Sequence, residues 1–335
     1  MASEHPADEI IVIDNKSKDE HVLLIKERFP NVKIRPLDYN YGFAKPMNIG
    51  IRESTAEFIL MLNNDAFIEP DFIGELVKVM ERDEKIGSVT GKVYRVATTR
   101  RGKKILDTTG HILYKNRLCE DRGAEKPDRG KYDKEEEIFG PCAAAAMYRR
   151  TMLEDIKIVD EYLDESFFAG REDIDLNWRA QLRGWRSWYV PQAIAHHKRS
   201  ATINRDQPRM TMHNYKNWRL VTSKNESEIE KKRWEPVYRF ADWLKKRHAG
   251  KTAVTTAQSE LTRLAEITQL KHDHIQKNRL VDDEAFSRWY KAGGSLILLR
   301  QIRRMVWRKV RERLNPDNDL ELSLFSTATE SAQGD

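Results

Sequence analysis

The sequence predicts an α/β fold whose first half carries a parallel β-sheet and whose C-terminal third is helical and basic. Two patterns carry this prediction. Short apolar runs alternate with amphipathic stretches from residue 9 to about residue 94, and after about residue 215 the sequence becomes long, charged and helix-favouring. A chain of 335 residues with 39% apolar and 33% charged residues can bury a core, which argues against disorder throughout.

Four apolar runs in the first half are the expected strands, and helices are expected near residues 18–29, 43–53 and 71–82 between them. Continuous β-branched and apolar runs separated by helices are typical of a parallel sheet that is covered on both faces. Ligands of such sheets bind at the carboxyl ends of the strands, so the residues just after each strand are the first candidates for chemistry. The four runs are EIIVID at 9–14, VKIRPL at 32–37, FILML at 58–62 and IGSVTGKV at 86–93.

The rest of the chain divides by composition. Residues 95–136 are a charged excursion in which we expect a hairpin around residues 110–118. A second ordered block contains a helix near residues 171–183 and a strand, WRSWYVP, that we expect to end at Pro191 because proline cannot donate a ladder hydrogen bond. We predict a first domain at 1–214, a helical extension at 215–314 and a disordered tail at 315–335.

The basic excess lies in the C-terminal third. Residues 215–335 hold 24 of the 59 Lys and Arg residues but only 17 of the 53 Asp and Glu residues. Apolar residues at helical spacing, among them Leu299, Ile302 and Val306, predict a basic amphipathic helix over 295–314. This helix either docks on its own domain or lies on an anionic membrane surface; nucleic acid is the least favoured partner.

Cysteine usage and hydropathy predict a location. Cys119 and Cys142 stand in no metal-ligand spacing, and no segment resembles a secretory signal. The longest apolar runs fall far short of the roughly 20 residues that a membrane-spanning helix needs. We therefore expect a cytoplasmic protein, with attachment to the inner face of the membrane if residues 295–314 bind lipid.

Asp65 is the first candidate for chemistry. It belongs to LNNDA at 62–66, directly after an apolar strand, where a carboxylate can bind a hard divalent cation. Asn64 stands beside it. An ordinary Asn/Asp turn is the structural alternative, because these side chains satisfy local backbone donors.

Glu172 and Asp173 are the second candidates, at the start of the helix REDIDLNWR. A carboxylate near a sugar acceptor can accept the hydroxyl proton as that oxygen attacks. The alternative is that these acids, with Asp175, complement the positive end of the helix dipole.

His196 and His197 follow the strand WYVP, and Asp14 ends the first recognisable strand. Imidazole can complete a metal site or stabilise a leaving diphosphate. Adjacent residues of a strand point to opposite faces, so we expect only one of the two histidines to face the site. An Asp at a strand tip can accept a hydrogen bond from a base or a ribose.

Six segments between residues 10 and 202 resemble, in order and spacing, the bacterial family 2 glycosyltransferases, especially the rhamnosyltransferase-like branch. They are IIVIDNKSKD, NYGFAKPMNIGI, FILMLNNDAFIEPDF, FGPCAAAAMYRR, FFAGREDIDLNWRAQLRGW and YVPQAIAHHKRSAT.

The resemblance implies a GT-A fold, a nucleotide diphosphate-sugar donor, a glycan or lipid-linked sugar acceptor, Mg²⁺ or Mn²⁺, and inversion at the anomeric carbon. Members of that family open with a further strand and helix, whereas only MASEHPADE precedes the IIVID strand here, so the resemblance also implies that this first element is lacking. The implied roles are nucleotide contact for Asp14, Asn40, Gly42, Asn48, Asn64 and Asp65, metal binding for Asp65, His196 and His197, general base for Asp173 and support of the acceptor or base for Glu172.

Two alternatives to an active enzyme stay open. A catalytically silent relative would bind nucleotide or membrane as a partner in glycan biosynthesis, which the lacking first strand favours. A polyanion-binding protein would use the basic tail, and its binding would depend on salt but not on metal. The retained acids and histidines favour the enzyme.

Overall fold

The structure is a computed structural model that describes residues 4–17, 21–100, 102–198, 208–248 and 251–294. Residues Met1–Lys291 form one compact unit. Its first half contains β1 (Ile11–Asp14), α1 (His21–Arg28), β2 (Lys33–Pro36), α2 (Ala44–Glu53), β3 (Phe58–Leu62), β4 (Ala66–Ile68), α3 (Phe72–Met80), β5 (Ile86–Arg100), β6 (Lys103–Thr108), β7 (His111–Tyr114), β8 (Cys119–Asp121), β9 (Glu136–Ile138) and β10 (Ala145–Arg149). Its second half contains α4 (Arg150–Asp155), η1 (Glu165–Phe167), α5 (Glu172–Leu182), β11 (Arg186–His197), α6 (Pro208–Asn225), α7 (Glu228–His248), α8 (Lys251–Arg263), α9 (Ala265–Asn278), α10 (Asp283–Phe286), η2 (Ser287–Trp289) and β12 (Tyr290–Lys291).

The central sheet is mixed rather than parallel. Its strands follow the order β3-β10-β5-β11-β4, with β6 and β9 added at the sides. β10 runs antiparallel to both β3 and β5 and separates these two strands. The predicted α/β fold with a central sheet and C-terminal helices is confirmed, but the expectation that the early strands form one parallel sheet is wrong. The sequence of β10, AAMYR, carries no sign of its direction, so the antiparallel insertion was not predictable from periodicity.

β11 continues beyond Pro191, which corrects the expected end of that strand. Its pairing with β5 shifts register between Val190 and Ile194, so the strand bulges around the proline and then resumes pairing to His197. Gly91 of β5 allows this close approach, because a Cβ atom there would lie 2.0 Å from the carbonyl oxygen of Ala193. The bulge therefore carries the histidine pair to the end of the sheet.

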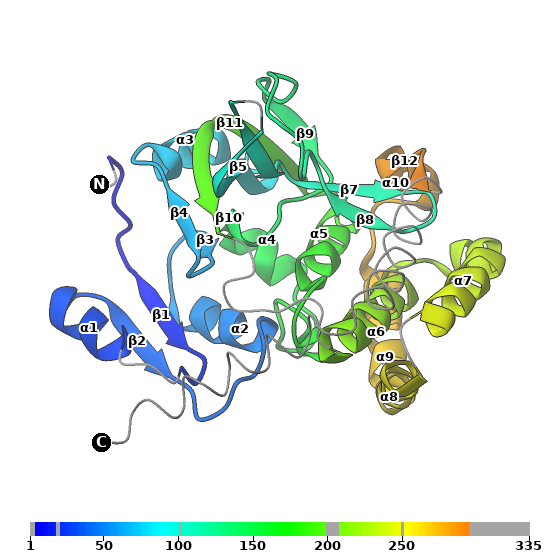
Figure 1. Ribbon diagram of the computed structural model, residues 1–335. Coiled ribbons are helices and arrows are strands. Elements are labelled where there is room, and N and C mark those ends of the chain that lie inside the picture. Colours follow the sequence, from blue (N-terminus) through cyan, green and yellow to red (C-terminus); the bar gives the residue numbers. More distant parts are fainter. Residues whose placement is uncertain (1–3, 18–20, 101, 199–207, 249–250, 295–335) are drawn as a thin grey trace, which may run out of the picture. The chain divides into compact units, whose positions relative to one another are not determined.

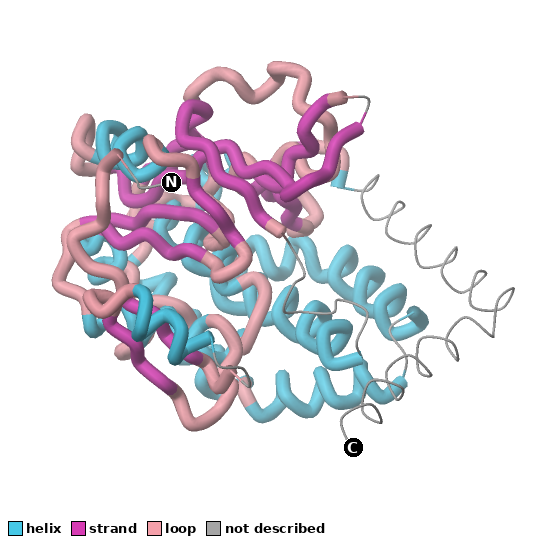
Figure 2. The backbone as a smooth tube through the Cα atoms, turned by 60° about the vertical axis from the view of Figure 1, so that its left-hand side comes forward, coloured by secondary structure: helices cyan, strands magenta, loops and turns pink. Residues whose placement is uncertain are grey.

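Helices cover both faces of the central sheet (Figures 1 and 2). Side chains of β10 show the division, because Ala145 and Met147 pack in one core with α3, whereas Ala146 and Tyr148 pack in the other with α2, α4 and α5. This alternation is the expected consequence of the period of two along a strand. The N-terminus of α5 is thereby fixed against the β10 face that carries Tyr148.

β1 and β2 form a separate two-stranded parallel sheet. In the described part of the chain, no strand hydrogen bond joins this pair to β3 or to any other strand of the central sheet. The exposed apolar residues of this region include Ile10, Leu23, Leu24, Phe29 and Leu62. The lack of an opening strand stays a prediction. Among the described residues, β1 and β2 pair only with each other.

The charged excursion folds into ordered structure. β7 and β8 form an antiparallel hairpin in which His111 lies opposite Asp121, and β12 adds to β7 in parallel. The hairpin lies close to the start of α5, because the backbone N–H of His111 donates to Gly140 at 2.8 Å and the side chain of Asn177 contacts His111. The hairpin expected around residues 110–118 is therefore present, and part of this charged excursion reaches the interior.

Buried ion pairs tie the helical region to the rest of the unit. Lys224 of α6 contacts both Asp164 and Asp175, and Lys271 of α9 contacts Asp164 at 2.8 Å. Burial alone would raise the pKa of Asp164, but the two ammonium groups together lower it. Asp175 also bonds Arg179, so this acid, one turn into α5, has a structural role.

The division into residues 1–214 and 215–314 stays a prediction. The basic helix expected over 295–314 and the tail at 315–335 lie outside the described residues. Among the helices that are described, none has both the length and the apolar character to cross a membrane.

Candidate active site

Asp65 lies where the ends of three strands meet. The chain turns after β3, with the N–H of Ala66 donating to Asn63 at 3.0 Å, and enters the short strand β4. The carbonyl of Asp65 accepts the N–H of Lys198, just beyond β11, at 2.8 Å. β4 pairs with β11 so that Ala66 lies opposite His197. A turn is thus present, as the structural alternative expected, and it also presents the carboxylate to a neighbouring strand.

Only His197 of the histidine pair contacts Asp65. Its Nε2 atom lies 3.1 Å from Oδ1 of Asp65, and its Nδ1 atom lies 2.8 Å from Oδ2 of Asp107. His196 points to the opposite side of β11, where its Nε2 atom lies 3.0 Å from Glu69. The side chain of Asn64 is exposed.

Asp107 is the hydrogen-bond partner of the Nδ1 atom of His197. The carboxylate of Asp107 is buried. In its ionised form it has no hydrogen to donate, so it accepts the hydrogen of Nδ1. When His197 is neutral, a hydrogen on Nδ1 leaves the lone pair of Nε2 on the side of Asp65. Metal-binding histidines commonly donate their other N–H to a carboxylate in this way, and the Asp65 carboxylate is a ligand type that suits Mn²⁺ and Mg²⁺.

The loop before α5 is conformationally strained. Phe168 has φ 63° and ψ −67°, and the N–H of Ala169 donates back to Phe167 at 2.8 Å, which closes a γ-turn. Gly170 and Arg171 then follow with φ of 85° and 76°. Such conformations persist only where surrounding contacts enforce them, and the amide nitrogen of Asn217 supplies some of these contacts through the carbonyls of 167, 169 and 170. The loop delivers Glu172 and Asp173 to the start of α5.

Asp173 faces the backbone that precedes β10. Its Oδ1 atom accepts the N–H of Ile174 at 2.8 Å, and its Oδ2 atom accepts the N–H of Ala143 at 3.3 Å. The carbonyl of Ala144, the next residue, accepts the N–H of Asn63 at 3.0 Å. The start of α5 and the loop that carries Asp65 therefore lie on either side of the same two alanines.

Glu172 is buried beside Asp173. Burial raises the pKa of Glu172 to about 8, and the negative charge of Asp173 adds to the effect. Its Oε2 atom and the hydroxyl of Tyr148 are both buried with no hydrogen-bond partner among the described residues. Burial also raises the pKa of Tyr148, again with a contribution from Asp173. Two unsatisfied polar atoms beside one carboxylate are the arrangement expected where a water or a substrate hydroxyl binds.

The loop of residues 40–42 is held by Asn15, the residue after Asp14. The Asn15 amide donates to the carbonyl of Gly42 at 2.6 Å and its oxygen accepts the N–H of Tyr41 at 2.9 Å. Asn40 accepts the N–H of Gly42 at 3.0 Å. This loop also meets the strained loop, because the N–H of Phe43 donates to the carbonyl of residue 168 at 2.6 Å. Three of the predicted nucleotide residues, Asp14, Asn40 and Gly42, thus lie in one connected group of loops.

Asn48 is placed differently. It is fully buried in α2, and its side chain both donates to and accepts from the backbone of Leu163 at 2.8 Å. The structure therefore gives Asn48 a role in joining α2 to the segment before α5, and its nucleotide contact stays a prediction without geometric support.

Sequence reasoning missed three residues of the candidate site. Asp107 and His111 both lie in the charged excursion, which gave no reason to expect buried side chains. The available signal was the pattern ILDTTGHILY at 105–114, where apolar residues flank an acid and a histidine around one glycine. Asn15 stood beside a predicted residue and was not singled out.

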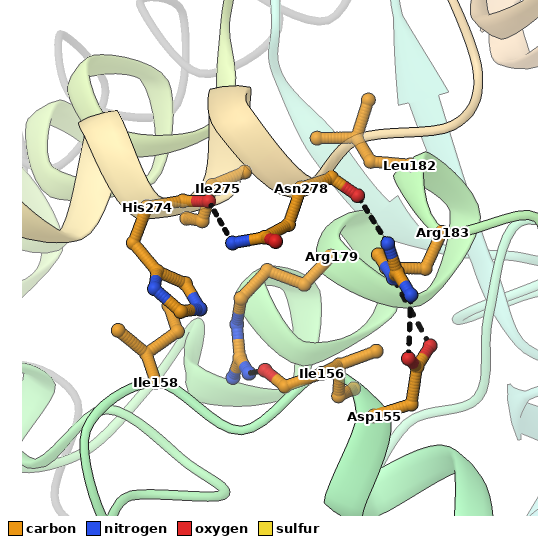
Figure 3. A pocket seen from close by; sticks show the side chains of 9 residues that line it. All are labelled: Asp155, Ile156, Ile158, Arg179, Leu182, Arg183, His274, Ile275 and Asn278. Atoms are coloured by element: carbon orange, nitrogen blue, oxygen red, sulfur yellow. Dashed lines mark hydrogen bonds and ion pairs between the residues drawn. The ribbon is translucent and has the colours of Figure 1, made fainter.

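A small cavity between α5 and α9 lies away from these residues (Figure 3). It measures about 20 Å³, which is room for a water molecule. Its lining includes Asp155, Arg179, Arg183, His274 and Asn278, and none of the predicted site residues.

Residues 1–157 match the family model described as glycosyl transferase family 2. The match supports a GT-A glycosyltransferase, in agreement with the resemblance of the six segments. It does not distinguish the rhamnosyltransferase-like branch.

Two curated proteins are similar to part of this chain at low identity. A poly-β-1,6-N-acetyl-D-glucosamine synthase of Staphylococcus epidermidis is 26% identical over 196 residues, which cover 58% of this chain and 43% of that protein. An N-acetylglucosaminyltransferase of Mesorhizobium japonicum is 27% identical over 196 residues, covering 56% of this chain and 43% of that protein. The match spans less than half of the length of these two relatives.

Two solved structures show a distant likeness. A crystal structure of GalNAc-T7 with UDP, GalNAc and Mn²⁺ aligns with a TM-score of 0.49 and 14% identity, over 64% of this chain and 42% of that one. A crystal structure of S. aureus TarS residues 1–349 with UDP-GlcNAc aligns with a TM-score of 0.45 and 15% identity, over 87% of this chain and 86% of that one. At these scores the likeness assigns neither ligand nor activity to this chain.

Proposed function

We propose that this chain is an inverting glycosyltransferase that moves a sugar from a nucleotide diphosphate-sugar to a glycan or lipid-linked acceptor. The observation that carries the proposal is the meeting of Asp65 and His197 at 3.1 Å, next to the loops that hold Asp173 and Gly42. These residues are far apart in the chain, yet they converge at the ends of the central strands, where α/β sheets bind ligands.

Asp65 and His197 would hold Mg²⁺ or Mn²⁺, with Asp107 orienting the imidazole. The cation, when bound, would offset the negative charge that develops on the nucleoside diphosphate as its bond to the anomeric carbon breaks. His196 is not included in this metal site, because its side chain is turned toward Glu69. Asp14, Asn40 and Gly42 would position the nucleoside through side-chain acceptors and backbone groups of the connected loops.

Asp173 would act as the general base. Its carboxylate is held by two backbone N–H groups, which fix its orientation while leaving further lone pairs for an incoming hydroxyl. The proton moves from the acceptor hydroxyl to Asp173 as the acceptor oxygen attacks the anomeric carbon from the face opposite the nucleotide. Glu172, which is mainly protonated at neutral pH, would donate a hydrogen bond to the bound acceptor or to a water beside it.

Calorimetric titration tests the donor site. UDP, dTDP and GDP are titrated into the full chain with and without Mn²⁺, and UDP-GlcNAc and dTDP-rhamnose then serve as donors in a nucleotide-release assay. We expect metal-dependent nucleotide binding that Asp65→Ala abolishes.

Asp173→Asn should retain that binding and lose turnover by about 100-fold or more. A folded chain that binds no nucleotide with Mn²⁺ would refute the proposal.

The second candidate, a catalytically silent relative, is favoured by one observation. The β1–β2 pair carries Asp14 and Asn15 but shares no strand hydrogen bond with the central sheet among the described residues. A nucleotide loop anchored on a separate pair of strands is less rigidly placed than one anchored on the sheet. Nucleotide binding without turnover of any donor would favour this candidate over the enzyme.

The membrane association predicted for residues 295–314 is kept as part of the proposal, with an anionic surface on the cytoplasmic side as the partner. Sedimentation of the full chain with vesicles containing phosphatidylglycerol, compared with a chain truncated after residue 294, tests it.

A further inference from the structure

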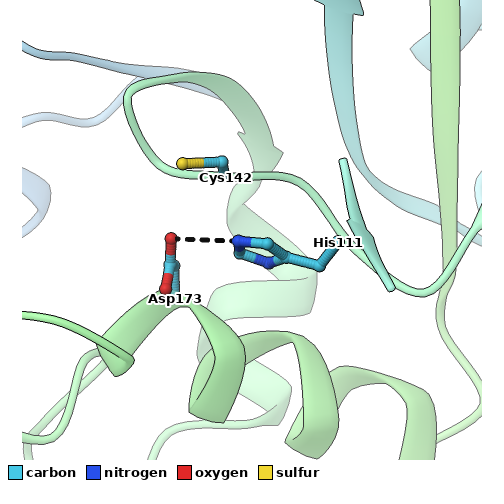
Figure 4. A group of neighbouring side chains, drawn as sticks. All are labelled: His111, Cys142 and Asp173. Atoms are coloured by element: carbon cyan, nitrogen blue, oxygen red, sulfur yellow. Dashed lines mark ion pairs between the residues drawn. The ribbon is translucent and has the colours of Figure 1, made fainter. Parts of the chain in front are cut away.

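His111 lies in a buried position next to Asp173 (Figure 4). Its Nε2 atom is 3.6 Å from Oδ2 of Asp173 and 3.6 Å from Oδ1 of Asp121, its cross-strand neighbour in the β7–β8 hairpin. The side chain of Cys142 lies near both residues, and ligand atoms of the three residues fall within 4.8 Å of one another (Figure 4). The proposed function gives no role to this histidine, although it lies so close to the base.

Asn177 determines which nitrogen of His111 carries the hydrogen. The amide nitrogen of Asn177 donates to the carbonyl of Pro141 at 2.8 Å, which identifies that atom as nitrogen rather than oxygen. The same NH₂ group lies 3.2 Å from Nδ1 of His111, so Nδ1 is the acceptor of this contact. The hydrogen of neutral His111 is therefore on Nε2, the atom that faces the two carboxylates.

This tautomer argues against a metal site at His111, Cys142 and Asp173. A metal bound between these residues would need the lone pair of Nε2, the nitrogen of His111 that faces Asp173, and a ligating histidine normally donates the N–H of its other nitrogen to an acceptor. His197 meets that condition through Asp107, whereas Nδ1 of His111 faces an N–H donor and its Nε2 carries the hydrogen. The two histidines thus differ in the partner of Nδ1, which is a carboxylate acceptor for His197 and an N–H donor for His111.

We propose that His111 is a positioning residue for Asp173, donating its Nε2–H between the Asp173 and Asp121 carboxylates so that the base keeps its orientation toward the acceptor. This inference rests on the proposed function of Asp173. In the absence of substrate, hydrogen bonds at catalytic groups often have long donor–acceptor distances. The 3.6 Å separation of His111 and Asp173 is therefore one that binding of the acceptor can shorten. The Ala143 N–H already holds the same Oδ2 atom, and His111 adds a second donor to it.

The surroundings of His111 contain few other charged groups. Asp121 approaches from β8, Asp173 from α5 and Cys142 from the segment before β10; Glu172 and Arg171 lie beside Asp173 on the chain. Asp121 contributes a second acceptor, whose Oδ1 atom lies as far from Nε2 of His111 as the Oδ2 atom of Asp173 does. The carboxylate of Asp173 is thus one of two acceptors on a fixed donor.

Nuclear magnetic resonance tests the tautomer without any assay of activity. The full chain is labelled with ¹⁵N-histidine, and the resonances of His111 among the nine histidines are assigned by their loss in His111→Gln. We expect the Nε2–H tautomer, and we expect Asp173→Asn to shift the Nε2 resonance. An Nδ1–H tautomer, or an Nε2 resonance that ignores Asp173→Asn, would overturn the inference.

Kinetics tests the positioning role. His111→Ala should lower kcat by about 10- to 100-fold while the Kd for UDP with Mn²⁺ stays unchanged, because a misplaced base costs turnover rather than donor binding. His111→Gln, whose amide can place an N–H near the position of Nε2, should recover part of the loss, and added imidazole should do the same for His111→Ala. Full kcat in His111→Ala would refute the role while the proposed function stands; a wild-type chain without turnover would instead count against that function.

Discussion

The carboxylate of Asp107 lies 2.8 Å from Nδ1 of His197 and so presents the other ring nitrogen to Asp65. If this contact prepares a metal ligand, Asp107→Asn and His197→Ala should each weaken Mn²⁺-dependent binding of UDP by about 10- to 100-fold. His196→Ala is the matched control, because the neighbouring histidine faces Glu69, and it should leave the affinity unchanged. Titration calorimetry measures all three. Equal losses in the two histidine variants would contradict the assignment.

Glu172 should make the stability of the protein depend on pH. Because burial raises the pKa of Glu172 from 4.5 to about 8, the unfolded chain releases this proton at a lower pH than the folded chain does. The free energy of unfolding therefore falls as pH rises from 4.5 to about 8. Glu172→Gln removes the penalty. Relative to the wild type, the variant should gain up to a few kcal/mol in the free energy of unfolding between pH 5 and pH 8, by about 1.4 kcal/mol per unit of pKa shift. Urea unfolding at several pH values measures the difference, and a gap that stays constant with pH would show that Glu172 ionises normally.

Gly42 should be intolerant of a side chain. Its φ is +81°, and a Cβ atom would lie 2.2 Å from the carbonyl oxygen of Phe168. Gly102→Ala is the control, because Gly102 has a φ of +72° but open space around it. We expect Gly102→Ala to cost about 1 kcal/mol and Gly42→Ala clearly more, together with weaker nucleotide binding. Urea unfolding and calorimetry report the two effects, and equal costs would mean that the loops of residues 42 and 168 are not in contact.

Lys224 should be essential for stability. It is buried between Asp164 and Asp175, so Lys224→Met would leave two buried carboxylates without their shared cation. The expected loss is about 3–5 kcal/mol in the free energy of unfolding. Lys232→Met, at an exposed position of α7, should change stability by less than about 0.5 kcal/mol. Chemical unfolding of both variants measures the two changes in the free energy of unfolding. A small loss for Lys224→Met would mean that the ion pairs of Lys224 do not hold the helical region in place.

The helices and strands were largely predictable because their signals are local. The runs FILML and IIVID, the turn residues after them and the acids at the start of REDIDLNWR lie where the pattern of the sequence places them. Pro191 shows the limit of such signals: proline alone predicts the end of a strand, but Gly91 on the neighbouring strand permits a bulge that lets β11 continue.

What the sequence by itself determined is the set of candidate groups: an acid after β3, two acids at the start of α5 and a pair of histidines at the end of β11. The tertiary structure alone decided which of them lie together. It selected His197 over His196 through the pairing of β11 with β4, and it brought Asp107 and His111 out of a charged excursion to orient His197 and to face Asp173. The physical reason is that hydrogen-bond partners and tautomers depend on contacts between residues far apart in the chain, for which neither periodicity nor local spacing carries a signal.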